Sequence, residues 1–76
     1  YEEAIRCYNK ALELDSNNAS AWNNKGVTLY NLKKYEEAVN CYDKALELNP
    51  NDEGVKKERE KALELKNFVE KLGGNQ

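Results

Sequence analysis

Apolar side chains recur with helical spacing in two segments of the chain. In both segments they occupy positions i, i+3, i+4, i+7, i+10 and i+11, which lie on one face of an α-helix. The pattern predicts an amphipathic helix within residues 1–16 and another over residues 35–48. The two stripes are Tyr1, Ala4, Ile5, Tyr8, Ala11 and Leu12, followed by Leu14, and Tyr35, Ala38, Val39, Tyr42, Ala45 and Leu46, followed by Leu48.

A third helical pattern covers about residues 19–32. Trp22, Gly26 and Leu29 fall on one side of this helix, and polar side chains fall on another. We expect it to pair with the helix that follows through a short turn at residues 32–34. This turn contains no glycine, so its geometry is not predicted.

The connections between these helices carry ordinary stop and start signals. Residues 15–18, DSNN, and residues 49–52, NPND, are rich in capping and turn residues. Pro50 cannot continue the helix that precedes it.

The first 18 residues, YEEAIRCYNKALELDSNN, are repeated with small changes at residues 35–52, YEEAVNCYDKALELNPND. The two stretches are identical at 12 of 18 positions, at a constant offset of 34 residues. A fixed period of this size is typical of stacked helical repeats, in which each helix pair buries its apolar face against its neighbour. The sequence therefore predicts an all-α fold, with the second helix of an incomplete repeat at residues 1–16 and a complete repeat at residues 19–52.

Residues 53–73 depart from the repeat, because Lys56 and Glu60 occupy the positions that Trp22 and Gly26 hold one repeat earlier. We expect one long helix that caps the last apolar surface of the stack. The alternative is a helix that bridges to another domain. Its apolar stripe consists of Val55, Ala62, Leu65, Phe68, Val69 and Leu72, and residues 74–76 are predicted to form a tail.

The complete repeat resembles the tetratricopeptide repeat family, whose pattern is Trp, Leu-Gly, Tyr, Ala, an aromatic residue and Pro. The matching residues are Trp22, Gly26, Ala38, Tyr42 and Pro50, whereas Lys25 and Leu29 stand where the family favours Leu and Tyr. The resemblance implies helix-turn-helix repeats stacked as a short right-handed solenoid. It also implies a repeat core of Trp22, Gly26, Leu29, Tyr35, Ala38, Tyr42, Ala45, Leu46 and Pro50.

The resemblance further implies a function. Members of the family are mostly protein-interaction scaffolds, whose first helices line a concave groove that receives a peptide or a partner's helix. The corresponding groove residues are Ser20, Asn23, Asn24, Val27, Tyr30 and Asn31. Asn24 is the most specific, because its amide can both donate to and accept from a peptide backbone. The alternatives are a segment that only extends or caps a longer superhelix, with a solvated helix face, and a self-associating fragment.

Composition argues against other classes of function. A chain of 76 residues has too little interior to enclose a substrate with a catalytic apparatus, so we expect no enzyme. Its 12 basic and 14 acidic residues interleave, which does not favour nucleic-acid binding. No apolar run approaches the ~20 residues that span a membrane. The chain has no histidine and no phosphate-binding glycine loop, so we expect neither a metal nor a cofactor.

Cys7 and Cys41 occupy the same position of successive repeats. We expect their Cα atoms to lie one repeat apart, beyond the ~7 Å limit for a disulfide. The prediction is two free thiols, which suit a cytoplasmic location.

The chain opens within a repeat, and we interpret it as part of a longer protein. One face of the first helix, which includes parts of Tyr1, Ile5, Tyr8 and Leu12, then lacks the helix that should cover it. We expect residues 1–14 either to fray or to be covered by another copy of the chain, through end-to-end stacking or exchange of helices.

Overall fold

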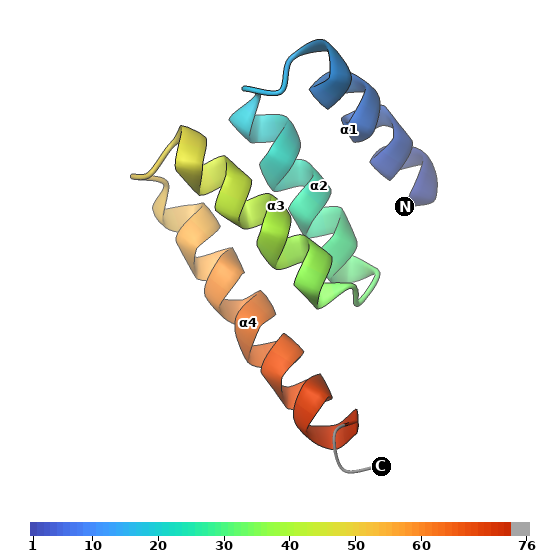
Figure 1. The fold of residues 1–76 in the computed structure, drawn as a ribbon, viewed down its shortest axis with the longest axis vertical. Helices are drawn as coiled ribbons and strands as arrows, with labels where there is room; N and C mark the ends of the chain where they lie inside the picture. The colour runs from blue at the N-terminus through green and yellow to red at the C-terminus, as the bar shows by residue number, and fades with distance from the viewer. Residues whose placement is uncertain (74–76) are drawn as a thin grey trace.

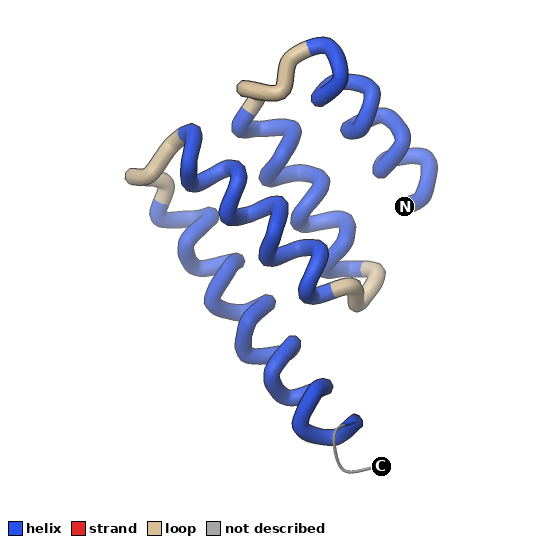
Figure 2. The backbone as a smooth tube through the Cα atoms, viewed as in Figure 1, coloured by secondary structure: helices blue, strands red, loops and turns tan. Residues whose placement is uncertain are grey.

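The computed structural model describes residues 1–73, which form four helices joined by short loops (Figures 1 and 2). The helices are α1 (Glu2–Leu14), α2 (Ala19–Asn31), α3 (Tyr35–Leu48) and α4 (Glu53–Gly73). Each helix packs on the next one along the chain, most extensively α2 on α3, and α2 also touches α4. The result is an all-α repeat stack with α1 at one end and α4 at the other (Figure 1). The predicted tail at residues 74–76 lies outside the described residues.

Two helices begin with the same cap, one repeat apart. The Asn18 side chain accepts a hydrogen bond from the backbone N–H of Ala21 at 3.0 Å, and the Asp52 side chain accepts one from Val55 at 3.2 Å. These bonds satisfy N–H groups that lack partners within the first turn of a helix. The short polar loops therefore fix where α2 and α4 begin.

The turn between α2 and α3 closes in a left-handed conformation at Lys33, whose φ is 66°. The Lys34 N–H donates to the Leu29 carbonyl and the Lys33 N–H donates to the Tyr30 carbonyl, each at 2.9 Å. This pair of bonds is a Schellman motif, which glycine usually closes because the conformation strains any residue with a Cβ. The turn therefore has the geometry that glycine favours, although residue 33 is a lysine.

Replacing Lys33 with glycine is expected to stabilise the fold. A left-handed L-residue costs about 1–2 kcal/mol, whereas the extra flexibility of glycine costs about 0.5–1 kcal/mol, so the free energy of unfolding should rise by about 0.5–1 kcal/mol. Thermal unfolding followed by circular dichroism measures the change. The matched control is Lys44→Gly, because Lys44 lies exposed within the α3 helix, where glycine lowers stability through its poor helix propensity. A Tm that falls in Lys33→Gly would contradict the strain argument.

The core is built around α3, which lies between α2 and α4. Of the repeat-core residues predicted from the sequence, the structure buries Gly26, Leu29, Ala38, Tyr42 and Ala45, and it buries Trp22, Tyr35 and Leu46 partly. The assignment of Pro50 to the repeat core is wrong, because Pro50 lies exposed in the loop after α3. Its ring ends a helix and fills no space between helices, so its recurrence in the repeat reflects the turn.

α4 has two different halves. Val55 and Ala62 are buried in its first part, while Lys56 and Glu60 are exposed on its surface. Its last turns extend beyond the N-terminal end of α3 (Figure 1). There the apolar stripe continues uncovered, with Phe68, Val69 and Leu72 each more than half exposed. The first part of α4 thus has the features of a cap. The exposed apolar end is the feature that the bridging alternative requires. Both roles of residues 53–73 are proposals.

Candidate partner-binding surface

α2 lies between its neighbours α1 and α3, and two opposite sides of it remain accessible. At 100° per residue, the six residues predicted to line a groove share one side of the helix. We call this side the α2 polar face. Ser20, Asn24 and Asn31 are exposed on it, and Asn23, Val27 and Tyr30 are half-buried.

Asn24 and Asn31 are the exposed amides of the α2 polar face. The Asn24 side chain is exposed, and its backbone carbonyl accepts a hydrogen bond from the Thr28 hydroxyl at 3.0 Å. Asn23 differs, since its Oδ1 atom is buried without a hydrogen-bond partner among the described residues. Asn24 can therefore offer both a donor and an acceptor to a partner, whereas the carbonyl end of the Asn23 amide is closed off.

Tyr30 provides a fixed aromatic side chain at one end of this face. Its ring lies edge-on to that of Tyr35, with 5.5 Å between centroids and 69° between planes. Val27 and Tyr30 both pack partly on the core. The face thus combines exposed amides with apolar side chains whose rotamers are restricted by packing, which limits the entropy lost when a partner binds.

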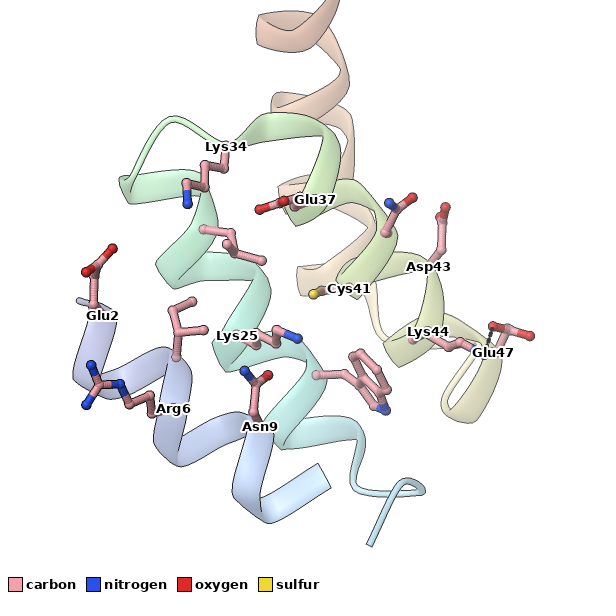
Figure 3. A pocket seen from close by; sticks show the side chains of 14 residues that line it. Glu2, Arg6, Asn9, Lys25, Lys34, Glu37, Cys41, Asp43, Lys44 and Glu47 are labelled. Atoms are coloured by element: carbon pink, nitrogen blue, oxygen red, sulfur yellow. Dashed lines mark ion pairs between the residues drawn. The ribbon is translucent and has the colours of Figure 1, made fainter. Parts of the chain in front are cut away.

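The opposite side of α2 forms the floor of an open trough of about 850 Å³ between α1, α2 and α3 (Figure 3). Ile5, Trp22 and Leu29 are among its apolar lining residues, and Figure 3 shows Lys25 reaching into it from α2. Its charged residues are Glu2, Glu37, Asp43 and Glu47, and Arg6, Lys25, Lys34 and Lys44. None of the six residues of the α2 polar face lines the trough.

Two contacts hold Trp22 within this trough. Its indole N–H donates to the Ser16 carbonyl at 2.9 Å, and the Lys25 ammonium lies 5.6 Å from the ring centroid. Sequence analysis assigned Trp22 to the repeat core and did not predict the trough, since its lining comes from three helices. The 34-residue offset could have indicated it, because it predicts that two equivalent helices flank α2.

Two groups of α3 with raised pKa values, the Cys41 thiol and the Tyr42 hydroxyl, are unsuited to catalysis at neutral pH. Burial is the main cause that raises the pKa of the Cys41 thiol, against the opposing charge of Lys25. Burial also raises the pKa of the Tyr42 hydroxyl, with a smaller contribution from the Glu58 carboxylate. Both groups stay protonated, and a protonated buried thiol is a poor nucleophile.

The cysteines and the metal-ligating side chains are the remaining candidates for chemistry within residues 1–73. Cys7 and Cys41 are both free thiols, the first exposed and the second buried. No group of three or more metal-ligating side chains gathers within residues 1–73. In the same residues, no helix combines the length and the apolar character needed to cross a bilayer.

Comparison with known families finds matches over residues 1–52 of the stack. The sequence model described as Tetratricopeptide repeat matches residues 19–52, and one described as TPR repeat matches residues 1–33. The chain belongs to the tetratricopeptide repeat family. A comparison with curated proteins finds no match. Tetratricopeptide repeats generally act as scaffolds for protein–protein interactions and are typically not enzymes. Surfaces of the stack are therefore the candidate sites.

Proposed function

We propose that this tetratricopeptide segment is a protein-interaction scaffold that binds a peptide or a partner's helix on the α2 polar face. The observation that carries the proposal is the exposure of Asn24 beside the half-buried Val27 and Tyr30. A peptide in extended conformation presents alternating N–H and C=O groups, which a side-chain amide matches. An apolar side chain of the same peptide could then lie on Val27 and Tyr30.

Charge and size define the partner only in general terms. The chain has a net charge of −2 with both signs interleaved, so the surface does not select a strongly charged ligand. A single helix face buries less than the roughly 1,200–2,000 Å² of a stable protein interface. We therefore expect a short peptide to bind this segment weakly, and repeats on either side in a longer protein would add affinity.

The experiment uses peptides selected from a random 12-residue display library on the 76-residue chain. The affinity of each selected peptide is measured by fluorescence anisotropy for the original chain and for the variant Asn24→Ala/Asn31→Ala. We expect at least a tenfold loss of affinity in this variant, because the amide contacts on the α2 polar face are removed. Circular dichroism confirms that the helical content is unchanged.

The matched control is Asn9→Ala/Asn40→Ala, which removes two exposed asparagines from the trough on the other side of α2. It should change the affinity less than twofold. Peptides that bind the α2-face variant as well as the original chain, or that lose affinity only in the control, would overturn the proposal. Failure to select any peptide would also count against it and would favour a purely structural role.

A further inference from the structure

The buried stripe of α4 has a charged residue along each of its edges. Val55 and Ala62 are buried and seven residues apart, which is close to two helical turns, so they mark the centre of the stripe. At 100° per residue, Glu58 and Arg59 lie on opposite edges of it, and both are half-buried. Both therefore border the packed side of α4, whereas Glu60 is exposed on the outer side.

These two half-buried charges differ in their partners. The Arg59 guanidinium forms an ion pair with the Asp43 carboxylate, which places this edge of α4 beside α3. Glu58 forms no ion pair among the described residues, not even with Lys57 or Lys61, which are exposed on the same helix. The Glu58 carboxylate is thus half-buried without a counter-charge in this part of the chain. Partial removal from water strengthens its attraction for a cation brought by another molecule.

Glu58 borders the α2 polar face. Since the Arg59 edge of α4 lies beside α3, the Glu58 edge lies on the side where α2 touches α4. The Tyr42 hydroxyl gives an independent indication. Burial is the main cause that raises its pKa, and electrostatic interactions with Glu58 and Tyr30 raise it further, so both side chains lie near this hydroxyl. Tyr30 belongs to the α2 polar face, so the carboxylate lies beside the aromatic end of that face.

We propose that an arginine of the bound partner pairs with Glu58 and stacks on the ring of Tyr30. The proposal rests on the proposed function, because it assigns one side chain of a peptide that binds the α2 polar face. Arginine suits both groups, since its planar guanidinium donates two parallel hydrogen bonds to a carboxylate and also stacks on aromatic rings. Lysine is a strongly hydrated point charge and fits this pair of groups less well.

The arginine should add specificity more than total affinity. Charged groups at the edge of an interface mainly select between partners, and their effect is screened by salt. The amide and apolar contacts of the α2 polar face would still hold a peptide without the arginine, but more weakly. We therefore expect the loss of this contact to cost at least fivefold in affinity without abolishing binding.

The first measurement uses the peptides selected from the random 12-residue display library on the 76-residue chain. We expect most of them to contain an arginine at a fixed distance from an apolar residue. They are synthesised with both ends blocked, which removes the N-terminal amine as an alternative cation. Replacing the arginine with glutamine should weaken binding at least fivefold. Peptides that lack arginine, or whose arginine can be replaced without effect, would overturn the proposal.

The second measurement removes the carboxylate from the chain. Glu58→Gln should weaken binding of the same peptides at least fivefold by fluorescence anisotropy. The matched control is Glu60→Gln, which removes the same charge from the outer side of α4 and should change the affinity less than twofold. Equal effects in the two variants would contradict the contact, because the net charge of the chain would then explain both. Circular dichroism checks that both variants keep their helical content.

An exchange of charges separates pairing from a structural role of Glu58. Glu58→Arg should prefer a peptide in which glutamate replaces the arginine, by at least fivefold over the original peptide. A purely structural role would not reverse the preference, so an unchanged preference for arginine would overturn the proposal.

The same variants distinguish this inference from the proposed function. Peptides that lose affinity in Asn24→Ala/Asn31→Ala but not in Glu58→Gln would contradict the arginine contact and leave binding on the α2 polar face intact. Peptides that are insensitive to both variants would contradict both proposals.

Discussion

Replacing Tyr42 with alanine is expected to lower the free energy of unfolding by about 3–5 kcal/mol, which is the usual cost of removing a large buried aromatic side chain. Tyr42 has no exposed surface and is the largest fully buried side chain of the stack. Small domains are stable by only about 5–15 kcal/mol, so the variant should lose a large share of its stability. Urea denaturation followed by circular dichroism measures the loss.

Tyr8→Ala is the natural control, because Tyr8 is the same residue at the same repeat position, but half-buried. Its cost should be less than half that of Tyr42→Ala when both are measured at micromolar concentration. Equal costs would contradict the view that neighbours in the stack, and not the repeat motif, determine the contribution of this tyrosine.

Tyr42→Phe separates the ring from the hydroxyl. The Tyr42 hydroxyl oxygen is buried and has no hydrogen-bond partner among the described residues. A buried polar group without a partner costs about 1–3 kcal/mol, so removing it should leave the free energy of unfolding unchanged or raise it by about 1 kcal/mol. A loss of stability in Tyr42→Phe would indicate that the hydroxyl has a hydrogen-bond partner in solution.

The second large effect is expected at Gly26 of α2, which packs against the Tyr42 ring of α3. A Cβ at this position would lie 2.6 and 2.8 Å from two atoms of the Tyr42 ring. Overpacking of this kind costs about 1–3 kcal/mol, whereas alanine gains up to about 1 kcal/mol over glycine as a helix former. We therefore expect Gly26→Ala to lower the free energy of unfolding by about 1–2 kcal/mol.

The sign of this effect should reverse when the ring is absent. In a Tyr42→Leu background the clashing ring atoms are gone, and Gly26→Ala should stabilise the chain by about 0.5–1 kcal/mol through helix propensity. The double-mutant cycle then gives a coupling energy of about 1.5–3 kcal/mol. Gly73→Ala serves as a control, because a Cβ there meets nothing within 4 Å. A Gly26→Ala change with the same sign in both backgrounds would contradict the proposed contact.

The α2 polar face illustrates how far the sequence can predict a site. The helical period places its six residues on one side of the helix, since the angle between residues is fixed by local geometry. Their accessibility depends on packing, and the structure exposes Asn24 while it closes off Oδ1 of Asn23. No pattern within one helix distinguishes these two neighbouring asparagines.

The sequence by itself determined the helices, the 34-residue repeat and the family, because these follow from short-range periodicity, capping residues and motif spacing. Only the tertiary structure decided which copy of the repeated stripe is buried. Cys7 and Cys41 have nearly the same local sequence, yet among the described residues α3 has a neighbour on both sides and α1 has one. The trough and the uncovered end of α4 likewise depend on how distant segments meet, because burial is a property of neighbours and not of a residue's own sequence.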